Sequence, residues 1–242
     1  MRLAFAHARA MTIELARHPA YVVPTVAFPA VFFLFFAAPG RRADADVRMA
    51  TFAGFAAIGV AFFQFGVGIA AERASPWEAY LRTLPVRSGV RLGARVLSAA
   101  VFAAAAAAVV VAVAAAVTPV ALAPGEWAEL AAALVAGTAP FALLGVAIGY
   151  WAPPRGALPL ANLMYLALSY AGGLWFRPQR LPQPVERVSG LLPTRALADV
   201  LAAPALGAAP PWRPWIALVG FAAAFGALAV WGYRRDEGRR YR

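Results

Sequence analysis

Few residue types in this chain could carry out acid–base, thiol or metal chemistry. The 242 residues include no cysteine and only two histidines, His7 and His18, which both precede the first long apolar stretch. All 22 Lys+Arg residues are arginines, so the chain lacks the lysine of a phosphate-binding ATPase loop. We therefore expect no thiol chemistry, no His-rich metal site and no cofactor in this chain.

The best-defined local motif lies within residues 71–85. In Ser75-Pro76-Trp77-Glu78, the Ser75 side chain would accept from the backbone N–H of Glu78, and the Glu78 side chain would bond back to Ser75. Pro76 would take the first helical position, where proline is favoured, and Pro85 would end the element. The pattern predicts a helix over 75–84, about 15 Å long.

One face of this predicted helix is apolar and needs a surface to pack on. Its stripe follows the spacing i, i+3, i+4, i+7, with arginines on both sides. A layer of lipid headgroups and a groove on a protein partner suit it equally well. The stripe is Trp77, Tyr80, Leu81 and Leu84, and the flanking basic residues are Arg73, Arg82 and Arg87.

Polar residues are rare inside the long apolar stretches, which makes each of them informative. Gln64 lies in one stretch, and Asn162, Tyr165 and Ser169 share one helical face of another. Such a stripe either lines a cavity or bonds to neighbouring helices. The aromatic residues Phe62 and Phe63 would suit hydrophobic or amphipathic cargo, or lipid contact. Gly145 and Gly149 have a spacing that lets helices approach closely, which favours packing over function.

The elements that must position these residues are membrane-spanning helices. Hydrophobic residues make up 62% of the chain, charged residues 14%, and the mean hydropathy is +0.68. A soluble domain is typically about half apolar and a quarter charged. Six stretches reach about 20 residues, the length that a span needs. They predict one all-α membrane domain over 1–242, with spans at about 21–38, 49–70, 96–117, 128–150, 157–175 and 215–233.

The charge distribution predicts the orientation of these spans. A net charge of +11 and a pI of about 11.3 would suggest nucleic-acid binding in a soluble protein. Here the side that holds both termini carries 14 arginines against five acids, and the other side carries eight against six. The positive-inside rule therefore places both termini in the cytoplasm, and no nucleic-acid partner is expected.

Two segments outside the spans have helical patterns. Residues 1–19 form either an amphipathic helix in the cytoplasmic interface, with Ala4, Phe5, Ala8, Met11 and Leu15 on its apolar face, or a flexible leader. Pro19 would break this helix before the first span. Residues 176–214 form either two short outer half-helices or a loose loop. Val185, Val188 and Leu192 fit the first half-helix; Leu197, Val200 and Leu201 fit the second, with Thr194 as its N-cap.

The order of these elements resembles that of the ABC-2 type permeases, the membrane subunits of ATP-driven exporters of drugs, antibiotics and other cargo. The resemblance rests on an amphipathic leader, a proline-containing first span, a second span that ends in Glu72-Arg73, and a short helix that stops at "Leu81-x-Thr83-Leu84-Pro85-Val86". It covers nearly the whole chain. One departure is that Ser75-Pro76 replaces a Gly-Thr pair common in the family, which leaves the class of ATPase partner open.

The resemblance implies roles for the residues above. The segment after the second span would be the coupling helix that docks on a separate ATPase subunit, which holds ATP and Mg²⁺. Two permease copies, identical or related, would work with two ATPase copies. Spans two and five would build the pathway. The implied coupling residues are Glu72, Arg73, Ser75, Pro76, Trp77, Glu78, Tyr80, Leu81, Arg82 and Leu84, and the implied pathway residues are Phe62, Phe63, Gln64, Asn162, Tyr165 and Ser169.

Two other functions remain alternatives to an exporter subunit that is not itself an enzyme. A secondary carrier usually shows intramembrane carboxylates or repeated halves. A membrane enzyme that acts on lipid needs converging acids, bases or metal ligands at membrane depth. The arginine- and alanine-rich composition is typical of a GC-rich bacterial genome and, with the spans, predicts a bacterial inner membrane location.

Overall fold

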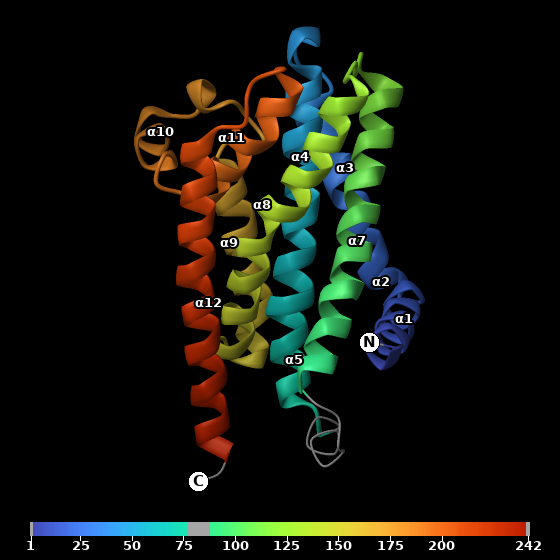
Figure 1. The fold of residues 1–242 in the computed structure, drawn as a ribbon, viewed down its shortest axis with the longest axis vertical. Helices are drawn as coiled ribbons and strands as arrows, with labels where there is room; N and C mark the ends of the chain where they lie inside the picture. Colours follow the sequence, from blue (N-terminus) through green and yellow to red (C-terminus); the bar gives the residue numbers. More distant parts are fainter. Residues whose placement is uncertain (1, 77–87, 241–242) are drawn as a thin grey trace.

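The computed structural model describes residues 2–76 and 88–240, and within them the regular structure is helical, with no strand. The long helices run side by side as one bundle, with α1 (Arg2–Ala16) against its flank and α10 (Gln183–Ser189) and α11 (Pro193–Ala205) at one end (Figure 1). The all-α membrane fold predicted from the sequence is confirmed.

Five helical segments are long and apolar enough to cross a membrane: Pro19–Ala37, Ala45–Ala74, Leu92–Val117, Pro124–Trp151 and Trp212–Glu237. Each contains one of the predicted spans, to within a residue. The last three belong to α7 (Ser88–Val117), α8 (Pro124–Trp151) and α12 (Trp212–Arg240).

The first two segments are not uniform α-helices, because π-helical turns interrupt them. The first consists of α2 (Pro19–Val22), η1 (Val23–Ala27), α3 (Phe28–Phe32) and η2 (Phe33–Ala37). The second consists of α4 (Ala45–Val60), η4 (Ala61–Val67) and α5 (Gly68–Ala74). A π-helical turn bonds i to i+5 and so holds one more residue per bonded turn than an α-helix.

The fifth predicted span, 157–175, corresponds to α9 (Pro154–Ala171), which is not among the five segments. Its 18 residues would extend about 27 Å, close to the thickness of the hydrocarbon core. Arg155 and Asn162 lower its apolar character. The helix runs beside α8 and η4 in the bundle (Figure 1), and that it crosses the membrane stays a prediction.

The fifth predicted span ends too late in the sequence, at Trp175. The structure ends α9 at Ala171, because Gly172 and Gly173 follow and Gly173 adopts a φ of +84°. Residues other than glycine rarely adopt that conformation, so the pair stops the helix.

The segment Ala45–Ala74 forms the centre of the bundle, and α12 lies at its edge. Within their most apolar stretches, 83% of the residues of Ala45–Ala74 are buried, against 17% for Trp212–Glu237. A largely exposed apolar helix in a membrane protein faces lipid or another subunit. The centre is rich in fully buried aromatic side chains: Phe33, Phe52, Phe55, Phe62, Phe141 and Tyr165.

Two glycines let α8 approach the second span closely. A Cβ on Gly145 would lie 2.5 Å from the carbonyl oxygen of Ala61, and one on Gly149 would lie 2.7 Å from that of Phe65. Both obstacles are backbone atoms, which cannot swing aside as a side chain can. The prediction that this spacing serves packing is confirmed.

The predicted pair of outer helices is also present, but α11 is part of the core. It packs against α4, α8 and α12, and its Leu197 and Leu201 side chains are fully buried. Thr194 as N-cap is wrong: Leu192 is the N-cap residue, since Pro193 takes the first helical position. The Thr194 hydroxyl instead donates to the carbonyl of Leu168 at 2.6 Å and joins α11 to α9.

The leader forms the predicted helix, and it packs on α7. Ala8 is buried, Met11 and Leu15 are half-buried, and the charged residues Arg9, Glu14 and Arg17 are exposed. Phe5, predicted for the apolar face, is 68% exposed, so the chain itself does not cover it. Pro19 starts α2, as expected of a proline between two helices.

Candidate functional site

The clearest constellation of polar groups lies where the second span ends, in the last turn of α5. Glu72 and Arg73, the acidic–basic pair noted in the sequence, point to different neighbours. Each makes an ion pair with a residue far away in the sequence. Glu72 and Arg73 therefore join α5 to other spans.

Arg73 binds two helices at once. Its Nε and Nη2 atoms donate to Oδ1 of Asp236 on α12, at 3.0 and 2.5 Å. Its Nη1 donates to the carbonyl oxygen of Gly149 on α8 at 2.8 Å, and its guanidinium lies 5.6 Å from the ring centre of Tyr150. Asp236 is only 8% exposed, so this is a mostly buried, charge-assisted contact of the strong class.

Glu72 makes the second connection, to Arg95 on α7. Arg95 is 7% exposed, and its Nη1 also donates to the backbone carbonyl of Gln64 in η4 at 3.4 Å. A buried arginine needs such partners, because an ion without them pays a large desolvation cost. Together, Glu72 and Arg73 connect the end of α5 to α7, α8 and α12.

The chain leaves this point in the conformation that a new helix start requires. Ser75 is extended, with φ −80° and ψ 132°, and Pro76 follows. These are the backbone angles of an N-cap. The predicted coupling residues Trp77, Glu78, Tyr80, Leu81, Arg82 and Leu84 lie outside the described residues, so the helix over 75–84 stays a prediction.

The predicted pathway residues gather around Tyr165 of α9. Its ring stacks on Phe55 at 4.6 Å, with Phe62 and Phe63 at 6.0 and 5.8 Å. Its hydroxyl donates to the backbone carbonyl of Phe55 at 3.1 Å. Within one chain, Tyr165 thus holds α9 against α4.

The other members of the polar stripe have different surroundings. The Ser169 hydroxyl is buried and donates to the carbonyl of Tyr165 in its own helix at 2.5 Å. Asn162, one turn before Tyr165, is half-buried. The predicted stripe therefore lies along one face of α9, and its burial decreases from Ser169, in the core, to Asn162, near the edge of the bundle.

Gln64, in η4, has an unusual environment. The residue is 5% exposed, and within the described residues neither amide atom has a hydrogen-bond partner of acceptable geometry. The Tyr21 hydroxyl faces the same amide and is likewise buried without a partner there. Buried polar groups without partners are uncommon, and they often mark functional positions.

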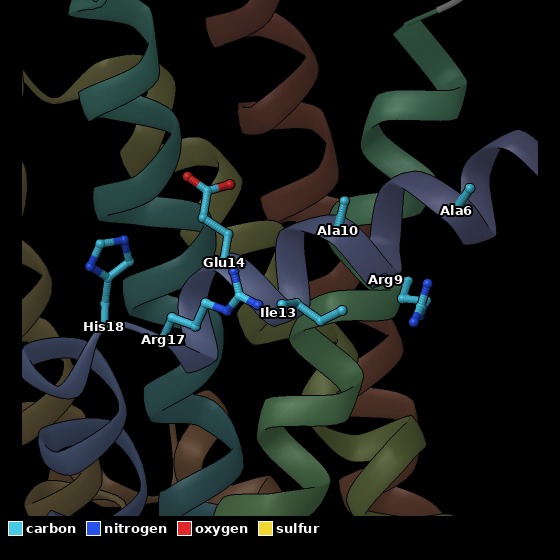
Figure 2. Close-up of a pocket in the computed structure, with 7 residues that line it drawn as sticks. All are labelled: Ala6, Arg9, Ala10, Ile13, Glu14, Arg17 and His18. Carbon is cyan, nitrogen blue, oxygen red and sulfur yellow. The ribbon is translucent and has the colours of Figure 1, made fainter.

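Two hollows lie away from the predicted pathway residues. One, of about 560 Å³, lies on the leader helix, and Figure 2 shows that its lining side chains come from α1 and from Arg17 and His18 just after it. Because this side of α1 faces away from α7, the hollow is a feature of the surface. The second, of about 210 Å³, lies between the α8–α9 turn and α12 and includes Arg73 and Asp236 in its wall.

Comparisons with known proteins identify the family. The family model for the ABC-2 type transporter matches residues 3–204, which is most of the chain. The chain belongs to the ABC-2 type transporter family. It is therefore a transport subunit of the permease type, and such permeases normally work with an ABC ATPase subunit. Comparisons with curated proteins and with solved structures found no match.

The match to the ABC-2 family begins in α1 and ends in α11. It includes Glu72, Arg73 and all six predicted pathway residues, but it stops before α12. Asp236, Arg95 and the Gly149 carbonyl were not singled out in the sequence as partners of the acidic–basic pair. The one available signal is that Asp236 and its neighbour Glu237 are acids in an otherwise arginine-rich tail, Arg234 to Arg242.

Proposed function

We propose that this chain is the membrane subunit of an ATP-driven exporter in a bacterial cell membrane, with both termini in the cytoplasm. ATP and Mg²⁺ would be bound by a separate ATPase subunit, and hydrophobic or amphipathic cargo would move outward. Two permease copies, identical or related, would complete the transporter. The family match, the long apolar helices and the arginine distribution support this proposal.

The observation that carries the proposal is the double connection at the end of α5. A docking helix can drive a membrane bundle only if the element that carries it is fastened to the other spans. Here Glu72 and Arg73, two to three residues before Ser75, bind α7, α8 and α12. A displacement of the segment after Ala74 is thereby transmitted to three helices through charge-assisted contacts.

We propose that cargo passes the surface formed by η4 and α9. The unsatisfied amide of Gln64, the aromatic ring of Tyr165 with Phe62 and Phe63, and the half-buried Asn162 would contact it. The Gln64 amide would gain a hydrogen-bond partner from cargo or from the second permease copy. Ser169 would support the position of Tyr165 through its bond to the Tyr165 carbonyl.

The proposal is tested by substituting the predicted docking stripe. Trp77→Ala and Leu81→Ala should abolish copurification of the ATPase and ATP-dependent export, while the amount of permease in the membrane stays unchanged. Trp212→Ala is a matched control, because Trp212 is also aromatic, is 65% exposed and begins α12, far from α5. If the Trp77 variant still binds the ATPase and exports normally, the coupling role is refuted.

The same assay separates the alternatives. Export that follows a proton or ion gradient and needs no ATPase would identify a secondary carrier. A lipid-directed enzyme would need converging catalytic groups, and across residues 2–76 and 88–240 no three His, Asp or Glu side chains gather as metal ligands do. No feature of the described residues favours either alternative over the permease.

A further inference from the structure

The second hollow combines a basic group, aromatic rings and a lipid-facing helix. It lies at the end of the bundle where α5 ends, between the α8–α9 turn and the last turns of α12 (Figure 1). Its volume of about 210 Å³ is below the roughly 300–1,000 Å³ of pockets for drug-sized ligands. It is lined by Arg73, Tyr150, Trp151, Ala152, Pro153, Pro154, Gly232, Arg235 and Asp236.

The charge of this hollow is positive. The charges of Arg73 and Asp236 largely cancel, because the two side chains form an ion pair. Arg235 is exposed, its guanidinium lies 4.8 Å from the ring centre of Trp151, and within the described residues no acid pairs with it. One guanidinium is therefore held in position by an aromatic ring while its N–H groups stay available to an anion.

The Trp151 ring is itself fixed in place. Its Nε1–H donates to the backbone carbonyl of Leu228 at 3.1 Å, and the ring packs edge-on to Trp231 at 4.6 Å. A Cβ at position 232 would lie 2.7 Å from Trp151 Nε1, so only glycine lets the indole sit so close to α12. The Trp151 ring on which the Arg235 guanidinium packs is therefore held in place before an anion binds.

The surroundings point to lipid as the occupant. Trp231 is 60% exposed and Val230 51%, on the helix that is least covered by the rest of the chain. Exposed tryptophans beside arginines are typical of the membrane–water interface, and basic pockets between spans on the cytoplasmic side bind anionic headgroups. A protein partner would instead need a broad interface around the hollow.

We propose that this hollow binds the phosphate of an anionic phospholipid of the cytoplasmic leaflet, with Arg235 as its main ligand. The acyl chains would run along the exposed face of α12. The hollow is too small for more than the headgroup. The cytoplasmic assignment rests on the orientation in the proposed function, whereas lipid binding to the isolated chain does not require transport.

The test compares lipids of identical acyl chains on the purified full-length chain, by native mass spectrometry after delipidation. Phosphatidylglycerol should bind about tenfold more tightly than phosphatidylcholine, the size of one charge-assisted hydrogen bond. Arg235→Gln should remove that preference, and Arg235→Lys should restore part of it. Arg234→Gln is the matched control, since it removes the same charge from an adjacent exposed residue that does not line the hollow.

Several outcomes would overturn the proposal. If the Arg234→Gln and Arg235→Gln variants lose the preference for phosphatidylglycerol to the same extent, the attraction between charges is diffuse and there is no site. Displacement of phosphatidylglycerol by millimolar inorganic phosphate would show an anion site that does not recognise lipid. Equal binding of both lipids, with weaker copurification of the ATPase in Arg235→Gln, would make this face a protein contact.

Discussion

The ion pair between Arg73 and Asp236 should be the strongest single electrostatic coupling between spans in the described part of the chain, and a double-mutant cycle measures it. Arg73→Met leaves the 8%-exposed Asp236 carboxylate without its arginine, whereas Asp236→Leu leaves Arg73 with its bond to the Gly149 carbonyl. Breaking a buried pair costs roughly 3–5 kcal/mol. Because Arg73 is 19% exposed and keeps the Gly149 bond, we expect about 3 kcal/mol for Arg73→Met and about 2 kcal/mol for Asp236→Leu.

The double variant Arg73→Met/Asp236→Leu should cost only about 1–2 kcal/mol, because apolar residues can replace a buried pair with little loss. The coupling energy is then about 3–4 kcal/mol. It would be measured from unfolding of the purified chain in mixed micelles with increasing SDS, with helicity as the signal. Melting points offer a second readout, at about 2–4 °C per kcal/mol for a chain of this size.

The pair Arg195–Asp199 on α11 provides the matched control. It has an N–O distance of 3.0 Å, but its side chains are 26% and 40% exposed and lie one helical turn apart. Its coupling should be about 0.3–0.5 kcal/mol. If the free energy of unfolding that the double variant loses equals the sum of the losses in the two single variants to within about 0.5 kcal/mol, Arg73 and Asp236 do not couple. In that case the proposed connection between α5 and α12 is refuted.

Two further substitutions test the centre of the bundle. Gly145→Ala should destabilise the chain by about 1–3 kcal/mol, because its methyl group would meet the Ala61 carbonyl, whereas Gly220→Ala, with no atom within 4 Å, should be neutral or stabilising by up to about 1 kcal/mol in the same unfolding assay. Equal effects at the two glycines would show that α8 is not held close to η4. Gln64→Leu should stabilise the chain by about 1–2 kcal/mol, by removing a buried amide without partners, and should lower export activity. A variant that loses stability but exports normally would remove Gln64 from the proposed pathway.

Much of the fold could be predicted from the sequence, because membrane helices are recognised by length and apolar content alone. Pro19 marks a helix boundary in the sequence, and its effect is local. The end of α9 was missed although Gly172-Gly173 is visible in the sequence, because Leu174 and Trp175 continue the apolar stretch beyond it.

The contacts that define the candidate site could not be predicted in the same way. Arg73 and Asp236 are 163 residues apart, and only the packing of both α5 and α12 on α8 brings them together. The burial of α11 has the same origin, since Leu197 could equally have faced lipid. The polar stripe at Asn162, Tyr165 and Ser169 was found because its periodicity is local, but its packing partner Phe55 was not.

The π-helical turn η4 divides the second span into two α-helices, α4 and α5, whose side chains do not share one helical wheel. An i to i+5 bond accommodates one residue more than an α-turn, and each residue of an α-helix turns by about 100°. The faces of α4 and α5 are therefore offset, and a single helical wheel drawn over both would mix them. Converting η4 into regular α-helix would remove that offset and rotate α5 about its axis relative to α4. Glu72 and Arg73 would then swing away from Arg95 and Asp236 together, so the two ion pairs also set the angular position of the span that leads to the predicted docking helix.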